Sequence, residues 1–381
     1  MPEPLRLSLS TADRAVVDVL VVGAGQSGLA LGHHLAAREA NFLLLEAAAE
    51  IGHSWRSRWD SLRLFSPAEY DALPGMPFPA PSGDYHPSKD DVADYLQAYA
   101  QRFELPVRLN SPVFRLHRAD GTFTATTPTG SVRARQVVVA TGPFQTPHIP
   151  AVAGRLDRLV PQLHSAEYRN PTQLPGAGQV LVVGAANSGL QIAAELGATQ
   201  AVTVAVGTRS TELPQRIAGR DLFFWLEKSG FISVPSHTRI ARRLRARGDL
   251  IIGTRSRALR RRGIDFRPRL TGLDGRTATF ADGTTVDVDA VVWATGYRSD
   301  YSWLHVPGVV VDGVVRHTAG VTDVPGLYFL GLPWQTCRGS ALLGFVGADA
   351  GTLADRMAAD ARRPPAGSVR GQATEPAIAP A

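Results

Sequence analysis

Cysteine is almost absent from this chain of 381 residues, in which Cys337 is the single example. One thiol cannot close an intrachain disulfide, and it cannot supply the Cys-x-x-Cys pair that dithiol redox catalysis requires. The sequence therefore excludes a dithiol-based disulfide reductase. The lack of disulfides fits a reducing cytoplasm, where we expect the protein to reside. We interpret Cys337 as a packed thiol rather than a nucleophile.

Long apolar runs are also missing. No stretch approaches the roughly 20 consecutive apolar residues that cross a bilayer. The start, Met1-Pro-Glu-Pro-Leu-Arg, lacks the apolar core of a secretory signal, so we expect no membrane partner. The sequence also offers no catalytic triad, no paired carboxylates and no cluster of metal ligands. We therefore expect no metal site and look to organic cofactors for the chemistry.

Charge of one sign is only slightly in excess, with 40 basic residues against 34 acidic ones and a formal net charge of +6. Much of the basic excess lies within residues 239–269, in Arg-rich runs at 242–247 and 260–262. These runs lack the interleaved aromatic residues of a nucleic-acid surface. We interpret them as a solvated helical face whose field attracts an anionic cofactor, and we expect no nucleic-acid partner.

Glycine, by contrast, stands in a pattern that occurs twice. Leu20-Val-Val-Gly-Ala-Gly-Gln-Ser-Gly-Leu29 recurs as Leu181-Val-Val-Gly-Ala-Ala-Asn-Ser-Gly-Leu190. Each copy joins a buried-type strand, at 16–22 and 179–183, to a helix-like stretch. A strand, a glycine turn and a helix in this order hold the pyrophosphate of a dinucleotide at the helix N-terminus. Two copies predict two bound dinucleotides, between which electrons pass.

In the first copy Gly23, Gly25 and Gly28 form the pattern G-x-G-x-x-G. The first glycine permits the turn, the second lets the backbone approach the pyrophosphate, and the third lets the helix pack on the strand. A second apolar run, at 42–45, follows the expected helix and ends in Glu46. A carboxylate there binds ribose hydroxyls and repels a 2′-phosphate, so this site favours FAD or NAD over NADP.

In the second copy Gly184 and Gly189 keep the first and third places, while Ala186 occupies the second. The methyl group of Ala186 crowds a pyrophosphate slightly, so we expect a looser fit. We also assign Asn187 and Ser188, where the following helix starts, to cofactor binding.

The next apolar run, at 201–206, ends in Gly207-Thr208-Arg209 rather than in an acid. Arginine grips a phosphate with two parallel N–H bonds, so Arg209 at this place favours NADPH over NADH. The alternative is that Arg209 is one of many solvated arginines in a basic region.

Two further apolar strands, 136–142 and 290–296, both end in Ala-Thr-Gly. Ligands of doubly wound folds sit at the carboxyl ends of the strands, where glycine lets the chain turn sharply. We therefore assign the residues that end these strands to the cofactor sites, namely Ala140, Thr141, Gly142, Thr295 and Gly296.

The doubled glycine turn with paired Ala-Thr-Gly strands resembles the two-dinucleotide-binding-domain flavoproteins. Within them the chain is most similar to the class B flavoprotein monooxygenases, which include the flavin-containing and YUCCA-type monooxygenases. The resemblance runs over about residues 18–357 and includes these further stretches: Ile51-Gly-His-Ser-Trp-Arg56, Tyr85-His-Pro-Ser-Lys89, His164-Ser-Ala-Glu-Tyr168, Ala294-Thr-Gly-Tyr-Arg-Ser-Asp-Tyr301 and Pro325-Gly-Leu-Tyr-Phe-Leu-Gly331.

The resemblance implies an α/β fold with two Rossmann-like dinucleotide-binding domains, the NADPH domain inserted into the FAD domain. We divide the chain into a discontinuous FAD domain (15–150 and 290–360), an NADPH domain (151–289) and flexible termini (1–14 and 362–381). The chain is expected to cross between the domains at 154–175 and again at 292–301. Alternating apolar residues at 107–132 predict a small antiparallel sheet within the FAD domain. The aromatic segment 213–236 either covers the cleft or packs between the domains.

The resemblance also implies contacts to the flavin. Trp55 and Arg56 are expected to lie along it, and Val113, Gln335 and Leu343 join the cofactor contacts. A helix predicted at about 347–358 would direct its N-terminus toward the flavin ring, where it stabilises negative charge.

Amine-oxidising members of the family place an asparagine near the position of Phe65, beside the flavin. Phenylalanine cannot donate a hydrogen bond to a peroxide. The neighbouring Ser66 can, so Ser66 is our candidate catalytic residue. The alternative is that Ser66 merely starts the Ser-Pro turn.

The activity implied by the resemblance is an NADPH-dependent monooxygenation. NADPH reduces FAD, reduced FAD captures O₂ as a C4a-(hydro)peroxide, and one oxygen atom enters a small organic substrate. Arg158 and Val160 replace the Phe and Gly of the monooxygenase fingerprint, and the Tyr-Pro-Gly stretch of Baeyer–Villiger enzymes is absent. The choice among heteroatom oxidation, hydroxylation and Baeyer–Villiger oxidation therefore stays open. So do the substrate and the oligomeric state, a homodimer included.

Two other functions remain consistent with the sequence. An NADPH–flavin reductase or oxidase would need the same two glycine turns but would transfer no oxygen to a substrate. A non-catalytic redox or nucleotide sensor could keep the fold, and its only support is the softened second turn at Ala186.

Overall fold

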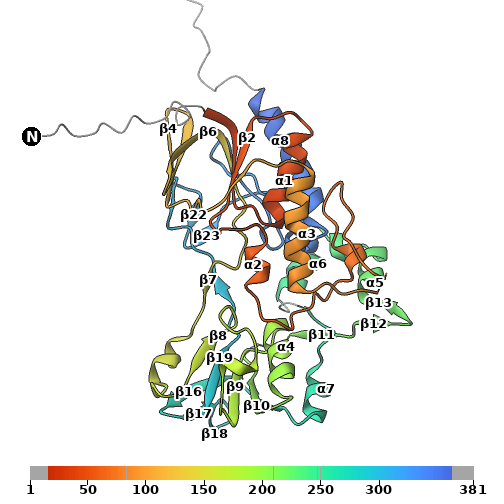
Figure 1. The fold of residues 1–381 in the computed structure, drawn as a ribbon, viewed down its shortest axis with the longest axis vertical. Coiled ribbons are helices and arrows are strands. Elements are labelled where there is room, and N and C mark those ends of the chain that lie inside the picture. The colour runs from red at the N-terminus through yellow and green to blue at the C-terminus, as the bar shows by residue number, and fades with distance from the viewer. Residues whose placement is uncertain (1–15, 83, 209, 247, 249, 363–381) are drawn as a thin grey trace, which may run out of the picture.

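The computed structural model describes residues 16–82, 84–208, 210–246, 248 and 250–362. Within them the chain forms two α/β units that two crossing segments connect (Figure 1). The predictions for Arg209 and for residues 1–14 and 363–381 lie outside the described residues. No helix in the described part of the chain is long and apolar enough to cross a membrane.

The first unit is built on a sheet in which β1 (Val16–Val22) lies between β2 (Phe42–Leu45) and β6 (Gly130–Val139), parallel to both. Strands β3 (Val107–Arg108) and β24 (Leu327–Phe329) extend it on either side, again in parallel. The predicted strands at 16–22 and 42–45 are confirmed. Their apolar residues suit a sheet that is covered on both faces.

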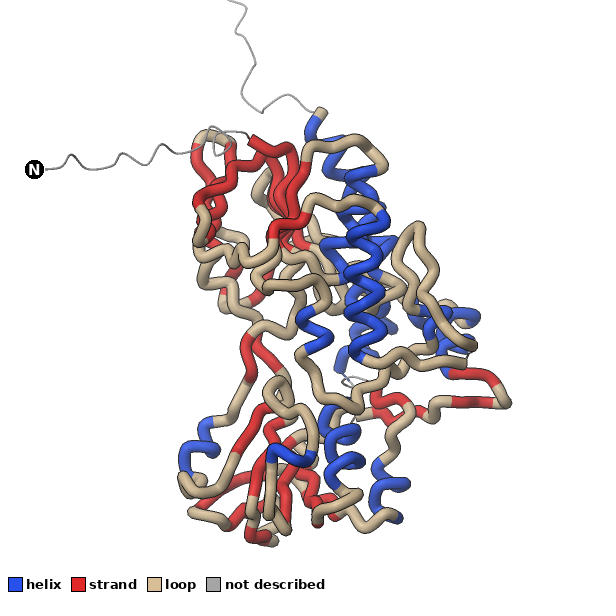
Figure 2. Tube along the Cα trace, in the orientation of Figure 1, coloured by secondary structure: helices blue, strands red, loops and turns tan. Residues whose placement is uncertain are grey.

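Helices cover one face of this sheet (Figure 2). Helix α1 (Gln26–Ala36) packs against α3 (Lys89–Arg102) and α8 (Val346–Ala361). Helix α1 begins directly after the glycine turn, with Gly25 as its N-cap in an extended conformation. Helix α3 starts at a capping box, in which the Ser88 and Asp91 side chains bond each other's backbone N–H.

The predicted antiparallel sheet exists but is not separate. Strands β4 (Arg115–Ala119) and β5 (Thr122–Thr127) pair antiparallel, and β5 continues onto β6. The ten residues of β6 make this possible, because its first half pairs with β5 and most of its length pairs with β1. The short β21 (Leu304–His305) forms the outer edge beside β4.

The second unit is a five-stranded parallel sheet in the order β15-β10-β9-β19-β8. Its strands are β8 (Gln162–His164), β9 (Gln179–Val183), β10 (Ala201–Ala205), β15 (Asp265–Arg267) and β19 (Ala290–Trp293). Helices α4 (Asn187–Leu196) and α7 (Ser256–Arg261) lie on its flank, and an antiparallel ribbon follows β15, made of β16 (Leu270–Asp274), β17 (Thr277–Phe280) and β18 (Thr285–Asp287).

The predicted boundary at residue 290 is wrong by one strand. Strand β19 pairs with β9 and β8 of the second sheet, where its four apolar residues are buried on both faces. The chain crosses instead where β7 (Thr146–Pro147) pairs antiparallel with β20 (Tyr297–Arg298). The predicted first crossing, 154–175, lies inside the second unit because it contains β8.

Residues 211–252, which we call the docking segment, leave the second sheet and return to it. The segment begins at β11 (Thr211–Leu213) and ends at β14 (Leu250–Ile252), which pair in parallel. Between them lie the hairpin β12–β13 (Arg216–Ile217 and Arg220–Asp221), α5 (Leu222–Lys228), η5 (Phe231–Ser233) and α6 (Arg239–Ala246). The buried Phe223 of α5 contacts Phe65, Tyr70 and Phe345 of the first unit. Phe223 thus packs between the units, whereas Trp225 on the same helix is exposed.

Candidate functional site

In the first glycine turn, two glycines allow close packing and the middle one leaves space for a ligand. A Cβ atom on Gly23, whose φ is +106°, would lie 2.6 Å from the carbonyl oxygen of Ala140, and one on Gly28 would lie 2.0 Å from that of Gly23. At Gly25 the same atom would meet nothing within 4 Å. The first and third glycines therefore allow backbone contacts inside the protein. The middle one faces open space at the N-terminus of α1, where a pyrophosphate can approach the backbone N–H groups.

Glu46 holds this turn in shape. Its carboxylate accepts hydrogen bonds from the backbone N–H of Ala24 at 2.9 Å and of Ala48 at 3.0 Å. The half-buried side chain thus connects the end of β2 to the glycine turn after β1. A carboxylate has lone pairs beyond these two bonds, so Glu46 can still accept a hydrogen bond from a ribose hydroxyl, as predicted.

The second turn repeats the geometry. A Cβ atom on Gly184 would lie 2.2 Å from the carbonyl oxygen of Ala294, and one on Gly189 would lie 2.0 Å from that of Gly184. Ala186 is the exposed N-cap of α4. The Asn187 side chain bonds the backbone of β14, donating to Leu250 O at 2.9 Å and accepting from Ile252 N–H at 3.1 Å. The Asn187 side chain thus fixes the start of α4 to β14.

The residues that end β6 and β19 fasten the crossing. Thr141 Oγ1 and the Gly142 carbonyl both accept from Gln145, each at 2.8 Å. The Thr295 hydroxyl donates to the carbonyl of His148, whose N–H donates to Gly296 O at 2.9 Å. Because β7 and β20 follow the carboxyl ends of β6 and β19 and pair with each other, these ends face a common space between the units.

His164, from the fingerprint-like segment, supports this crossing. Its ring is fully buried; Nδ1 accepts from Ala166 N–H at 3.1 Å, so Nε2 carries the hydrogen that is donated to Gly296 O at 3.0 Å. Burial lowers its pKa. A neutral imidazole therefore satisfies both contacts, and His164 fixes the end of β8 to the start of β20.

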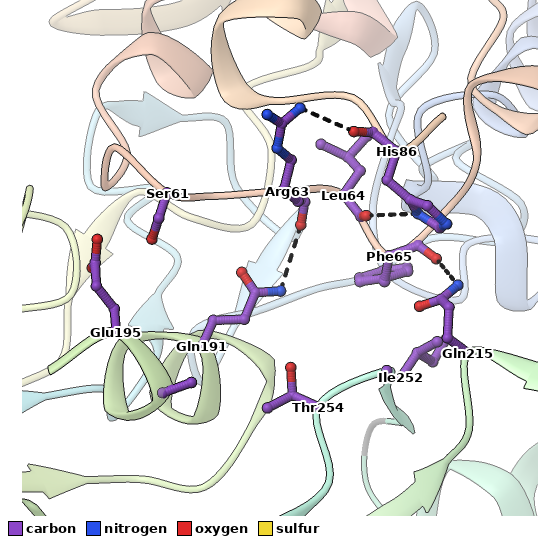
Figure 3. Close-up of a pocket in the computed structure, with 12 residues that line it drawn as sticks. Ser61, Arg63, Leu64, Phe65, His86, Gln191, Glu195, Gln215, Ile252 and Thr254 are labelled. Carbon is purple, nitrogen blue, oxygen red and sulfur yellow. Dashed lines mark hydrogen bonds between the residues drawn. The ribbon is translucent and has the colours of Figure 1, made fainter. Parts of the chain in front are cut away.

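A cavity of about 470 Å³ lies between the two units, beside α4 (Figure 3). The first unit contributes Ser61, Arg63, Leu64, Phe65 and His86, and the second contributes Gln191, Ala194, Glu195, Gln215, Ile252, Gly253 and Thr254. Gln215 donates to Phe65 O at 2.9 Å, whereas the Arg63 guanidinium turns away from the hollow toward His86 O. The volume is within the range of small-ligand sites.

His86 and Asp221 form a charged contact at the wall of this cavity. The Nδ1–H of His86 donates to Leu64 O at 3.0 Å, and Nε2 lies 3.5 Å from Asp221 Oδ2. A neutral ring would therefore turn a lone pair toward the carboxylate, and the pKa of His86 is raised chiefly by Asp221. Asp221 also caps α5 and accepts from Gln215 at 2.8 Å.

The candidate catalytic residue Ser66 is buried and paired. Its hydroxyl donates to Asp71 Oδ1 at 2.6 Å, and only 7% of Ser66 and 2% of Asp71 are exposed. Burial raises the pKa of Asp71 to about 7, while the bond from Ser66 and the nearby His86 act in the opposite direction. Asp71 Oδ2 is buried and has no hydrogen-bond partner among the described residues.

The remaining predicted residues are spread around the first unit. Arg56 contacts Glu50, Asp90 and Asp94 at 3.3, 3.6 and 2.8 Å, so its guanidinium already has anionic partners. The other predicted residues differ in burial: Leu343 and Gln335 are buried, whereas Trp55, Val113 and Ser188 are half-buried. Their contacts to a cofactor stay predictions.

The described residues fit a bound dinucleotide with a polar ring edge. The open space at Gly25 and the N-terminus of α1 suit the pyrophosphate. Near the start of α8, two further buried polar atoms, Gln335 Nε2 and Asp349 Oδ2, lack a partner among the described residues. Buried polar groups are nearly always hydrogen-bonded, so these atoms are suited to a flavin, whose pyrimidine edge carries both donors and acceptors.

The sequence did not single out Asp71, Asp221 or Gln215. They lie in loops or at a helix cap, where no periodicity marks them. Gln215 and Asp221 reach Phe65 O and His86 only because the docking segment returns to the first unit. His86 was within a stretch that resembled the family, but its contact with Asp221 depends on tertiary structure.

Comparisons with known proteins agree with this geometry. The sequence profile of the pyridine nucleotide-disulphide oxidoreductase family matches residues 20–226. A protein of Geobacillus kaustophilus, named uncharacterized oxidoreductase CzcO-like, is 46% identical over 337 residues, which cover 88% of this chain and 96% of the relative. The indole-3-pyruvate monooxygenase YUCCA8 of Oryza sativa subsp. indica is 30% identical, covering 87% of this chain and 88% of that protein.

Among solved structures, the flavin-containing monooxygenase of Stenotrophomonas maltophilia superposes with a TM-score of 0.76 at 30% identity, covering 90% of this chain and 98% of that one. The predicted fold class, two Rossmann-like domains with one inserted into the other, is confirmed. The chain therefore belongs to the pyridine nucleotide-disulphide oxidoreductase family and, within it, to the class B flavoprotein monooxygenases, flavin-dependent oxidoreductases whose cofactors are FAD and NADPH.

Proposed function

We propose that the protein is an NADPH-dependent monooxygenase that transfers one oxygen atom of O₂ to a small organic substrate in the space between its two units. One observation carries the proposal. Both glycine turns lie at carboxyl ends of their own sheets, and the paired β7 and β20 direct those ends toward each other. Two dinucleotides held in this way have their reactive rings within reach of each other.

Bound FAD, once reduced by NADPH, supplies the chemistry that activates oxygen. The chain has the simpler tasks of binding, orienting and excluding water. The N-terminus of α1, opened by Gly25, binds one pyrophosphate, and the N-terminus of α4 at Ala186 binds the other. The docking segment closes the side of the inter-unit space with the buried Phe223 and Leu226, which keep water away from the reacting groups.

NADPH preference is part of the proposal. Arg209, whose placement is outside the described residues, follows β10 at the position where a 2′-phosphate is bound in such domains. If it grips this phosphate, Arg209→Ala should remove most of the preference for NADPH over NADH in kcat/KM and leave the NADH value nearly unchanged.

A reductase or oxidase without oxygen insertion is the second candidate. The observation in its favour is that the side chain at Phe65 is apolar and that the Ser66 hydroxyl already donates to Asp71. A site with no free hydrogen-bond donor protects activated oxygen less well, so peroxide would leave before it meets a substrate.

Following the oxygen atoms of O₂ into product or peroxide distinguishes a monooxygenase from an oxidase. The FAD-loaded protein is given NADPH and ¹⁸O₂, and NADPH oxidation, oxygen uptake and hydrogen peroxide are followed with thioethers, tertiary amines and indole-3-pyruvate, the substrate class in the name of the rice relative. A monooxygenase yields labelled product and releases less peroxide per NADPH when its substrate is present. An oxidase releases one peroxide per NADPH with every compound. Absence of NADPH oxidation by the flavin-loaded protein would contradict both.

A further inference from the structure

The bond between Ser66 and Asp71 has two forms. With Asp71 ionised, the carboxylate can only accept, so the Ser66 hydrogen points at Oδ1, as the 2.6 Å contact describes. With a proton on Oδ1, the carboxyl donates to Ser66 Oγ. The serine hydrogen is then free to rotate toward another acceptor.

We propose that Asp71 is a positioning residue that decides, by its own protonation, whether Ser66 presents a hydrogen or only lone pairs to the flavin and its substrate. The proposal deepens the proposed function and rests on it. The proton comes from solvent and binds to Asp71; no other bond is made or broken in the switch.

The location of the pair supports this role. Gly344 fits so tightly against the loop of Asp71 that a Cβ atom there would lie 1.9 Å from Tyr70 O and 3.1 Å from Asp71 Cα. Gly344 lies two residues before the start of α8 and follows Leu343, a predicted flavin contact. The loop that carries Asp71 thus packs against the short segment of chain that leads into α8, in whose first turn lies the unpartnered Asp349 Oδ2.

The unpartnered oxygen is a second, independent sign of a ligand. Asp71 Oδ2 is buried with no partner among the described residues, in a side chain that is only 2% exposed. A buried carboxyl oxygen without a hydrogen bond is costly, because it has lost its water and gained no other donor. This oxygen is therefore available to accept a hydrogen bond from a bound molecule or from water.

Titratable groups approach Asp71 from two other elements, while Glu69 and Tyr70 are its neighbours in sequence. From α3 comes Tyr95, whose hydroxyl accepts from Leu73 N–H. His86 approaches from the loop before α3 and is held by Asp221 of the docking segment. Desolvation outweighs these effects, and the pKa of Asp71 lies near 7, so both forms are populated in the physiological range.

The form with Asp71 protonated, in which Ser66 can donate, favours oxygen transfer. A hydrogen bond from Ser66 stabilises negative charge that develops on the transferred oxygen. Coupling, defined as oxygenated product per NADPH, should therefore fall as the pH rises through about 7. We expect the fall to be roughly tenfold, the factor of one hydrogen bond to a charged group.

Two substitutions lock the switch. Asp71→Asn keeps the shape and offers an N–H to Ser66 Oγ at every pH, so coupling should keep its low-pH value in alkaline solution. Ser66→Ala removes the donor, so coupling should be low and independent of pH, and Ser66→Thr should restore the wild-type profile. Flavin content and thermal midpoint verify that each variant is folded. Asp287→Asn is the matched control, since Thr277 Oγ1 donates to Asp287 at the same 2.6 Å on an exposed ribbon.

An infrared titration of the FAD-loaded protein provides a readout that needs no turnover. The wild type should show a protonated carboxyl band that disappears through about pH 7. Asp71→Asn should lack the band, and Ser66→Ala should shift its frequency because the hydrogen bond is gone. No titrating band, or identical pH profiles of coupling in Asp71→Asn and the wild type, would overturn the proposal. A titrating, Ser66-sensitive band in a protein that transfers no oxygen at any pH would instead contradict the proposed function.

Discussion

Gly28 stands so close to Gly23 that a Cβ atom on Gly28 would lie 2.0 Å from the Gly23 carbonyl oxygen. The contact joins the first turn of α1 to the end of β1, and no side chain can relieve it because the obstacle is backbone. Gly25, between them in sequence, would place the same atom in open space. One short motif thus contains a glycine that the fold needs and a glycine that we expect the ligand to need.

Gly28→Ala and Gly25→Ala should therefore fail in different ways. Gly28→Ala forces α1 away from β1, and we expect a loss of roughly 3 kcal/mol in the free energy of unfolding, or no soluble protein. Gly25→Ala, at an N-cap with φ of −76°, should cost about 1 kcal/mol or less but weaken FAD binding at least about tenfold. Thermal midpoints and flavin-to-protein absorbance ratios measure both. A Gly25→Ala protein that retains full FAD affinity would contradict this assignment.

The second turn offers the reverse experiment. Ala186 is exposed at the N-cap of α4, so its methyl group occupies the space that Gly25 leaves open in the first turn. Ala186→Gly should lower the KM for NADPH several-fold and leave stability within about 0.5 kcal/mol, because glycine is also the better N-cap. The neighbouring Ala185, half-buried against the core of the second unit, provides the control. An unchanged KM in Ala186→Gly would show that the methyl group does not crowd the cofactor.

Sequence patterns predicted the two sheets well because the signals are local. The runs at 16–22 and 179–183 are apolar enough for strands buried on both faces, and both were found at those positions. The boundary at 290 was misplaced because Ala290–Trp293 reads like the strand after the first glycine turn, and only pairing with β9 and β8 assigns it to the second sheet. Periodicity identifies a strand but does not name its neighbour.

The site was harder to predict than the fold. Ser66 was singled out from its place next to Phe65, but its partner Asp71 carries no pattern, and the loop between them has neither helical nor strand periodicity. The wall that Gln215 and Asp221 build depends on a segment that leaves the second sheet and returns. Such contacts follow from tertiary packing and cannot be read from local sequence.

The contact between His86 and Asp221 should make the docking of the two units depend on pH. The raised pKa of His86 means that its contribution is complete below the ordinary histidine value of about 6.5 and is lost as the pH rises through the higher folded value. The lowered pKa of Asp221 means that its contribution is present above the ordinary aspartate value of about 3.9 and is lost on acidification through the lower folded value. The contact between His86 and Asp221 is therefore strongest at pH values between the folded pKa of Asp221 and that of His86.

His86→Gln should therefore destabilise the protein most in mildly acidic solution, by roughly 1 kcal/mol, and least at alkaline pH, where the wild-type ring is neutral. Glutamine keeps a donor for Leu64 O but carries no charge. Denaturant unfolding across the pH range measures the difference, and protease sensitivity of 211–252 shows whether the docking segment is released. A difference that grows toward alkaline pH would contradict the charged contact.

The buried carboxyl of Asp71 should leave a mark on stability with the opposite sense from most aspartates. Its folded pKa of about 7 lies above the ordinary value of 3.8, so between these values the folded protein binds a proton that the unfolded chain has released. Stability therefore falls as the pH rises from about 4 to about 7, by up to roughly 4 kcal/mol, and stays at that lower level at higher pH.

Asp71→Asn removes the ionisation. The stability of this variant relative to the wild type should therefore increase across this pH window and stay constant at higher pH. Ser66→Ala removes a bond that lowers the pKa of Asp71, so in that variant the fall should extend to higher pH. Denaturant unfolding at a series of pH values tests both, and parallel curves for the wild type and Asp71→Asn would show that Asp71 titrates as an ordinary exposed carboxyl.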